Sequence, residues 1–181
     1  VVVLMAIDHV RVYSGQPAGG PTAGIFFTRW VTHFVAPGFA FFAGTGAFLH
    51  GLKLGDRGKL ARFLASRGIW LVVLELTFMR FAWTFNGDYA HYSLAGVLWM
   101  LGWCMVLMAG VIYLPMWAIA TFGVVTIVAH PVLYPLMGSV HAPEGSVVDA
   151  MFKVLYLGEG FSIGKDGPPL LVLFVIVPWI G

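Results

Sequence analysis

Apolar residues in this sequence form long continuous runs rather than alternating with polar ones. A helix that crosses a membrane needs roughly 20 mainly apolar residues, whereas a membrane β-barrel requires alternation over short segments. The runs therefore predict an all-α, polytopic transmembrane helical bundle, because irregular backbone would leave unpaired polar groups in lipid. Six spans are expected: Val1 to about Ser14, about Thr28 to Leu52, Gly68 to about Phe85, about Tyr92 to Leu114, Met116 to about Met137, and a sixth that starts near Leu170.

Both ends of the sequence lie inside apolar runs. It opens at Val1 without a methionine, and it stops at Gly181 within a run too short to span a bilayer. We therefore expect a single transmembrane domain over residues 1–181, with its first and last spans truncated, as a piece of a longer protein. Any signal or targeting segment would then lie outside this piece.

The composition supports lipid as the surrounding solvent. Hydrophobic residues make up 60% of the chain and charged residues only 10%, whereas a soluble domain carries roughly 25% charged residues. The net charge of +2 is too small to indicate a nucleic-acid partner. The single cysteine, Cys104, allows no internal disulfide. The expected partner is the lipid bilayer, and a homo-oligomer stays open.

The basic residues predict an orientation. Five of the ten lysines and arginines lie in residues 53–67, between the second and third predicted spans. By the positive-inside rule this loop is cytoplasmic. The loops Ser14–Thr28, Asn86–His91 and Gly138–Pro169 then face the outside. The last of these is expected to hold a short helix from about Ser146 to Leu157, amphipathic enough to lie at the membrane interface.

Ionisable side chains inside the predicted spans are the candidate functional residues, because charge is costly in lipid. Depth follows from a rise of about 1.5 Å per helical residue, which places Glu75 near the middle of the bilayer. Seven other residues share one depth in the outer half: Asp8, His9, Arg11, Arg29, His33, Arg80 and His130. We expect His9, His33 and Arg80 to converge on one site.

These residue types limit the chemistry. His33 and His9 are the candidate general base or nucleophile, because the pKa of histidine lies near neutrality, and Asp8 is the candidate orienting carboxylate. Asp8 and Arg11, three residues apart, could also pair on one helix face. Arginine binds phosphate or carboxylate through two parallel hydrogen bonds. The substrate- and anion-binding candidates are Arg29, Arg80, Arg11, Glu75 and His130. No spacing typical of metal ligands occurs, so no metal site is predicted.

Structural roles are the alternative for several of these residues. The side chains of Arg11 and Arg29 could extend to the lipid headgroups. Glu75 and Arg80 could form a structural ion pair. His130 precedes Pro131 and could mark a helix kink instead of a site.

Several stretches carry a family resemblance. Met5–Arg11 contains an Asp-His pair, and Phe26–Thr45 contains the element Thr-His-Phe-x-x-Pro-x-Phe, followed by Arg67–Thr77, Arg80–Asn86 and Leu98–Met105. Together they resemble the bacterial membrane proteins grouped with the catalytic domain of heparan-alpha-glucosaminide N-acetyltransferase.

The resemblance implies a transmembrane acyltransferase of the bacterial cytoplasmic membrane. Its reaction would move an acetyl or other acyl group from acetyl-CoA, or another acyl-CoA co-substrate, to an amino sugar or cell-envelope glycan. A histidine is central to the transfer in that family and lies in the loop before the Pro-x-Phe-x-Phe helix. The corresponding residues 15–28 contain no histidine, and His33 stands about where the eukaryotic motif has an aspartate.

Two other functions stay open on the sequence. In a small-molecule transporter or permease, Asp8, Glu75 and Arg80 would be coupling or substrate charges. In a non-catalytic membrane protein, the same charges would only hold helices together. The cations of residues 53–67 could meet the phosphates of CoA, although topology alone explains them.

Overall fold

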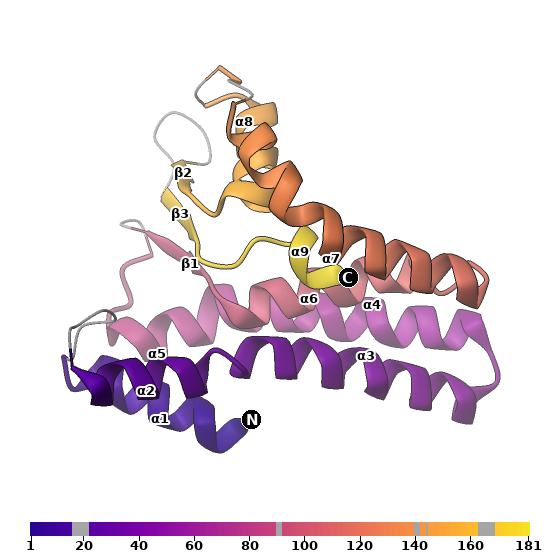
Figure 1. Ribbon diagram of the computed structural model, residues 1–181, viewed down its shortest axis with the longest axis horizontal. Helices are drawn as coiled ribbons and strands as arrows, with labels where there is room; N and C mark the ends of the chain where they lie inside the picture. Colours follow the sequence, from indigo (N-terminus) through magenta and orange to yellow (C-terminus); the bar gives the residue numbers. More distant parts are fainter. Residues whose placement is uncertain (16–21, 90–91, 140–141, 144, 163–168) are drawn as a thin grey trace. The chain divides into compact units, whose positions relative to one another are not determined.

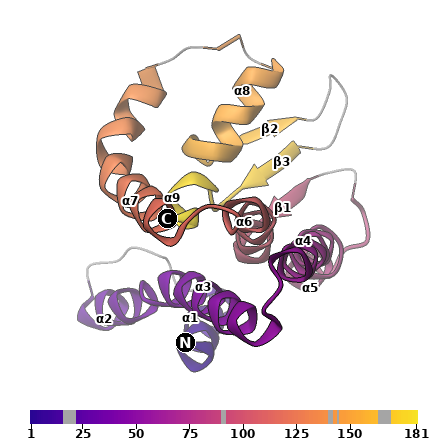
Figure 2. The ribbon, with the colours of Figure 1, turned by 90° about the vertical axis from the view of Figure 1, so that its right-hand side faces the viewer.

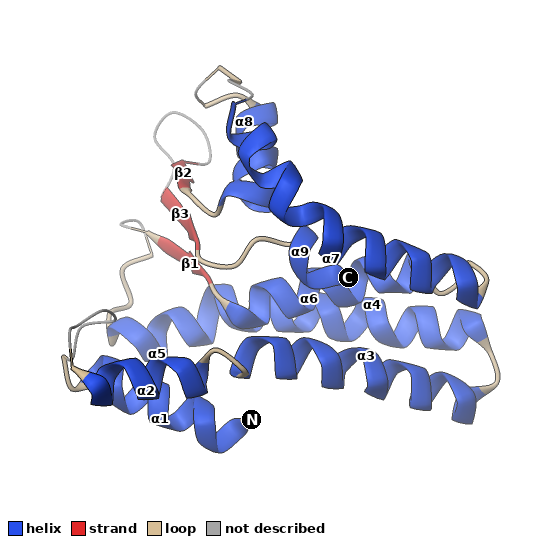
Figure 3. Ribbon diagram, viewed as in Figure 1, coloured by secondary structure: helices blue, strands red, loops and turns tan. Residues whose placement is uncertain are grey.

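The computed structural model describes residues 1–15, 22–89, 92–139, 142–143, 145–162 and 169–181. The chain is mostly helical, and it divides into two compact units, Val1–Phe48 and Leu49–Gly181. Helix α3 (Val35–Leu54) begins in the first unit and ends in the second. Figure 3 shows the helices in blue and the short strands of the second unit in red.

The first unit contains two helices that pack side by side, α1 (Val2–Tyr13) and α2 (Ala23–Thr32). Helix α2 begins after Thr22, whose hydroxyl accepts a hydrogen bond from the Ile25 N–H at 3.4 Å and so caps the helix. A turn at His33 separates α2 from α3. Pro37 lies in the first turn of α3 and has no N–H to donate to the His33 carbonyl, which explains the break.

The second unit is built around a pair of packed helices. Helix α4 (Arg57–Leu74) continues through the π-helical turn η1 (Glu75–Met79) into α5 (Arg80–Thr84). Helix α6 (Val97–Val111) packs along it, as Figure 1 shows.

The closest approach of α4 and α6 is at two glycines. A β-carbon on Gly68 would lie 2.5 Å from the Gly102 carbonyl oxygen, and one on Gly102 would lie 2.6 Å from the Gly68 carbonyl oxygen. Glycine is therefore required at both positions, and such close backbone contact is typical of helix crossings in membranes.

A small sheet lies beside α6. Its strands are β1 (Ser93–Ala95), β2 (Gly160–Ser162) and β3 (Pro169–Val172), in the order β1-β3-β2. Strand β1 is parallel to β3, and β2 is antiparallel to it. Ala95, Leu170 and Val172 are buried against Trp99 of α6. Figure 2 views α6 end-on, with β1 next to it.

The remaining helices of the second unit are α7 (Met116–Ser139), α8 (Val147–Phe152), the π-helical turn η2 (Lys153–Leu157) and α9 (Val177–Ile180). Helix α7 contains Pro131 and Pro135, and its axis bends along its length in Figure 1. Each proline removes one backbone hydrogen bond, which accounts for the bend. The predicted helix from Ser146 to Leu157 is confirmed by α8 and η2.

Two of the six predicted spans coincide with helical segments long and apolar enough to cross a membrane. They are Ala23–Leu54 and Met116–Gly138. Within the described ranges no other helix meets both criteria, so the count of six spans is not supported. The single transmembrane domain stays a prediction.

The structure agrees with some of the other predicted spans and differs from others. Helix α1, with 12 residues, agrees with the truncated run expected from Val1 to about Ser14. Helix α6 has 15 residues, fewer than the roughly 20 that a span needs. The sixth prediction, a helix from Leu170, is wrong because this segment is strand β3. Leu170 and Val172 are buried while Leu171 is exposed, and a continuous apolar run conceals this period of two.

Candidate functional site

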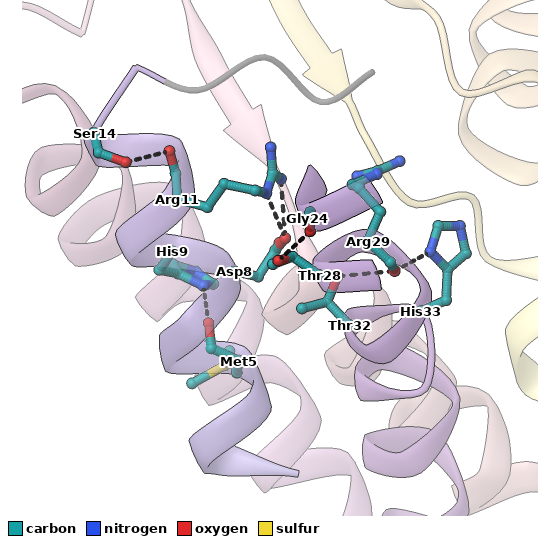
Figure 4. Close-up of polar contacts among 10 residues, drawn as sticks. All are labelled: Met5, Asp8, His9, Arg11, Ser14, Gly24, Thr28, Arg29, Thr32 and His33. Carbon is teal, nitrogen blue, oxygen red and sulfur yellow. Dashed lines mark hydrogen bonds and ion pairs between the residues drawn. The ribbon is translucent and has the colours of Figure 1, made fainter. Parts of the chain in front are cut away.

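The first unit holds a partly buried ion pair on α1. Arg11 donates from Nη2 to Oδ1 of Asp8 at 2.9 Å and from Nε to the same oxygen at 3.3 Å. The Arg11 side chain is 8% exposed and that of Asp8 is 30% exposed. Figure 4 shows the pair on the side of α1 that faces α2. The predicted pairing of these two residues is confirmed, and it occupies the carboxylate expected to orient a histidine.

Backbone carbonyls orient the two candidate catalytic histidines. His9 Nδ1 lies 2.8 Å from the Met5 carbonyl oxygen, and His33 Nδ1 lies 2.6 Å from the Arg29 carbonyl oxygen. A carbonyl oxygen only accepts hydrogen bonds, so Nδ1 carries the proton in the neutral ring and Nε2 has the lone pair. Nε2 is therefore the atom on each ring that can act as base or nucleophile. His33 is exposed, and His9 is half-buried.

The Arg29 carbonyl oxygen accepts several hydrogen bonds at the end of α2. It accepts from the His33 backbone N–H at 3.0 Å, from the Thr32 hydroxyl at 3.1 Å and from the His33 ring. The His33 N–H makes the ordinary helical bond to this carbonyl, and side chains three or four residues farther along a helix can share the same acceptor. In Figure 4 the side chain of Arg29 extends toward the same end of the helices as that of Arg11.

Glu75 caps a helix of the second unit. It is 3% exposed, and its Oε2 accepts a hydrogen bond from the Leu98 N–H at 2.9 Å. The backbone N–H groups of Gly96 and Trp99 also form hydrogen bonds with this carboxylate. The first turn of α6 has unpaired N–H groups and a partial positive charge, so an anion is stabilised there. Glu75 thus lies at the start of α6, and the mid-bilayer depth expected for it stays a prediction.

Arg80 is enclosed by the segment that follows α5. It is 1% exposed and donates to the carbonyl oxygens of Tyr92 at 3.1 Å, Asn86 at 2.5 Å and Asp88. Its Cζ lies 4.4 Å from the ring centre of Tyr89 and 5.3 Å from that of Tyr92. Carbonyl oxygens and aromatic faces both attract a cation, so this guanidinium holds the segment against α5. Its role as an anion binder stays a prediction.

His130 lies on α7 between two tyrosines. Its ring stacks on Tyr156 at 6.1 Å between ring centres and meets Tyr134 edge-on at 5.9 Å. Its Nδ1 is buried and has no hydrogen-bond partner among the described residues. The neighbouring Pro131 is compatible with the kink interpretation, and substrate binding by His130 stays a prediction.

The structure places the candidates in two groups. Asp8, His9, Arg11, Arg29 and His33 lie together on the α1–α2 hairpin. Glu75, Arg80 and His130 belong to the second unit. The expected convergence of His9 and His33 with Arg80 joins the two units, and it stays a prediction.

Sequence reasoning missed several polar partners in these groups. Thr32 is buried at the end of α2, and Tyr89 and Tyr92 supply the aromatic faces beside Arg80. Thr28 and Thr32 are four residues apart in an apolar helix, a spacing that places them on one face and was available as a signal. The tyrosines gave no such signal, since their contact depends on how the chain turns after α5.

In the ranges that the structure describes, no three histidine, cysteine, aspartate or glutamate side chains gather as metal ligands. Comparisons with protein-family models, curated proteins and solved structures find no match to this chain.

Proposed function

We propose that the chain is part of a multi-pass membrane acyltransferase, which moves an acetyl or other acyl group from a CoA thioester to an amino sugar or cell-envelope glycan. The observation that carries this proposal is the 2.6 Å distance between His33 Nδ1 and the carbonyl oxygen of Arg29. The His33 Nδ1–H donates to the Arg29 carbonyl, which leaves the Nε2 lone pair on an exposed ring. The resemblance of Phe26–Thr45 supplies the reaction class.

His33 can act by either of two routes. As a nucleophile, Nε2 attacks the thioester carbonyl, the carbon–sulfur bond breaks, and CoA leaves as a thiolate that takes a proton from water. The acceptor amine then attacks the acyl-imidazole carbon, releases His33 and gives up its own proton to water. As a general base, Nε2 takes the proton of the amine while the amine attacks the thioester directly; the carbon–sulfur bond then breaks and the departing CoA thiolate takes the proton from Nε2.

Arg29 is the better of the two hairpin arginines as an anion binder. The charge of Arg11 is partly neutralised by Asp8 at 2.9 Å, and its side chain is buried. Arg29 carries its charge on the neighbouring helix, one turn before His33. A guanidinium one helical turn from His33 can bind a phosphate of the acyl donor or a carboxylate of the acceptor.

The wider arrangement of the proposal follows the hydropathy and charge pattern. We place the chain in the bacterial cytoplasmic membrane as a helical bundle, with residues 53–67 on the cytoplasmic side.

The contacts of Glu75 and Arg80 favour acyl transfer over a transporter. A coupling residue must exchange its proton or substrate during each cycle. Glu75 is bonded to the first turn of α6, and Arg80 to three carbonyls of its own unit. Transport through these residues would break contacts that hold the second unit together.

The proposal is tested with labelled acetyl-CoA and the full-length protein in detergent micelles, over a panel of amino sugars and envelope glycans. We expect label in an acceptor and release of free CoA, and a loss of about 100-fold or more in His33→Gln, the range typical of a removed general base. His9→Gln shows which of the two histidines reacts. His50→Gln, which changes a histidine of α3 outside the site, serves as the control and retains the rate. No transfer to any acceptor, or full activity of both histidine variants, contradicts the proposal.

A further inference from the structure

The end of α3 and the first half of α4 form an exposed cationic surface, here named the basic tip. It consists of the five cations in residues 53–67: Lys53, Arg57, Lys59, Arg62 and Arg67. All five side chains are exposed. We propose that the basic tip is a binding surface for the phosphate groups of anionic phospholipids in the adjoining membrane leaflet.

The backbone beneath the basic tip is held firmly. Asp56 caps α4 by accepting from the N–H groups of Gly58 at 2.8 Å and Lys59 at 3.1 Å. Gly55 has a φ of 62°, a left-handed conformation that glycine adopts without strain and that turns the chain between the two helices. The hairpin thus presents its cations from a fixed turn, and less entropy is lost when they bind.

Side-chain packing closes the two helices on each other. The ring centres of His50 and Phe63 are 4.4 Å apart. A β-carbon on Gly51 would lie 2.7 Å from Cδ2 of Leu60, so the last turn of α3 sits directly on the first turns of α4. Arg57 also donates to the Tyr113 carbonyl at 3.1 Å, which ties the tip to the end of α6.

The positive charge of the tip is largely uncompensated. Asp56 is the only acidic residue in residues 53–67, and its Oδ1 is engaged by two backbone amides. Its contact with Lys59 is long, at 3.9 Å, between side chains that are 48% and 72% exposed. Exposed ion pairs of this kind contribute little to stability. Lys53 and Arg62 carry their charge on the same hairpin and add to its positive field.

The apolar residues on either side of the tip indicate a membrane surface rather than a soluble ligand. Leu52 is 67% exposed just before it, and Ile69 and Trp70 are 57% and 59% exposed just after it. The segment Ala23–Leu54 is also one of the two that are long and apolar enough to span. Clusters of four to eight cations directly beside a span are typical of anionic-lipid binding.

The test uses the full chain in a neutral detergent, incubated with equal amounts of phosphatidylglycerol and phosphatidylcholine of the same acyl chains. Native mass spectrometry then counts each lipid retained by the protein. We expect selective retention of phosphatidylglycerol, falling by about fivefold for each cation removed and lost in the triple variant Lys53→Gln, Lys59→Gln, Arg62→Gln. Arg57 is left in place because it bonds to Tyr113.

The matched control keeps the charges and changes the same positions: Lys53→Arg, Lys59→Arg, Arg62→Lys. We expect it to retain the selectivity, and circular dichroism checks the helix content of each variant.

If the triple variant does not fold, Arg62→Gln alone is measured against the same fivefold expectation. Unchanged selectivity in the glutamine variants, or none in the original chain, overturns the proposal. Displacement of the lipid by equimolar CoA or inorganic phosphate assigns the tip to a soluble phosphate and also overturns it. Since the proposal does not depend on acyl transfer, either can fail alone.

Discussion

At the scale of single residues, the Asp8–Arg11 pair is the clearest case of charge held inside an apolar hairpin. Burial removes water from both groups, and an ion pair repays that cost only when its geometry is good. Here one carboxylate oxygen accepts from two nitrogens of the guanidinium, at 2.9 and 3.3 Å. Because Arg11 is the more buried partner, loss of Asp8 removes the carboxylate that offsets a largely buried positive charge.

This arrangement predicts strong coupling between the two side chains. Asp8→Ala is expected to lower the free energy of unfolding by about 1 to 3 kcal/mol, and Asp8→Ala with Arg11→Ala by less than the sum of the single changes. The measurement is thermal unfolding of the four proteins in micelles. The exposed pair Asp56–Lys59 provides the comparison and should show no measurable coupling. Additive effects at Asp8 and Arg11 would contradict this account.

The residue-level contacts differ in how far sequence can predict them. Asp8 and Arg11 are three residues apart on one helix, so their pairing follows from helical geometry. The contacts of Glu75 and Arg80 depend on chain segments that return from farther along the sequence. Spacing alone indicated that their charges were buried and gave no sign of their partners.

At the scale of elements, the crossing of α4 and α6 determines how the second unit packs. Gly68→Ala and Gly102→Ala each introduce a β-carbon within 2.6 Å of a backbone carbonyl oxygen on the opposite helix. Backbone atoms cannot move aside as a flexible side chain can. We therefore expect each substitution to lower the free energy of unfolding by about 1 to 3 kcal/mol. Thermal unfolding in micelles measures it.

Gly110 is the matched control for this crossing, because it lies on α6 and a β-carbon there meets nothing within 4 Å. Gly110→Ala should be neutral or slightly stabilising, since alanine favours a helix over glycine. Equal effects of the three substitutions would mean that the glycines do not form the contact.

The start of α4 should respond to pH. The Lys59 N–H bond lowers the pKa of Asp56 most, and the Gly58 N–H and the cations of Lys59 and Arg62 add to it. Because the pKa is depressed in the folded state, the carboxylate stabilises the helix start at neutral pH, and this contribution disappears as the pH falls below about 4. Amide exchange at Gly58 and Lys59, corrected for intrinsic rates, should show protection lost on acidification. In Asp56→Asn this loss of protection with falling pH should be much smaller. If the variant has the same pH profile of amide exchange as the original protein, the Asp56 carboxylate does not cap α4.

Elements were predicted well where the apolar run was helical and poorly where it was not. The long run of α7 has only one regular structure that suits it, a helix. The break between α2 and α3 depends on Pro37 and the missing bond to His33, and the sequence prediction of one span from Thr28 to Leu52 passed over it. Strand β3 is apolar at every position and short, so its period of two was hidden.

At the scale of the whole molecule, the sequence predicts that His9 and His33 of the first unit converge with Arg80 of the second, and this stays a prediction. The sequence argument for this was a shared depth, which depends on how many spans there are and where each begins. Contacts between distant parts of the chain are not encoded in local spacing, so the expected convergence of His33 with Arg80 had no other support in the sequence.

The proposed orientation makes a prediction of its own. A cysteine introduced as Lys59→Cys should react with a membrane-impermeant thiol reagent only from the cytoplasmic side, and one introduced as Glu159→Cys only from the outside. The native Cys104 is 6% exposed and should stay unlabelled. Labelling of both positions from one side of sealed vesicles would contradict the proposed topology.

The most direct test of acyl transfer is the release of CoA thiol from acetyl-CoA by the full-length protein in the presence of glucosamine, followed with a thiol reagent. The account predicts rapid release by the original protein and by His50→Gln, and release slowed about 100-fold or more in His33→Gln. Equal release by His33→Gln and the original protein would contradict the role of Nε2. No release at all, across amino-sugar acceptors, would contradict acyl transfer itself.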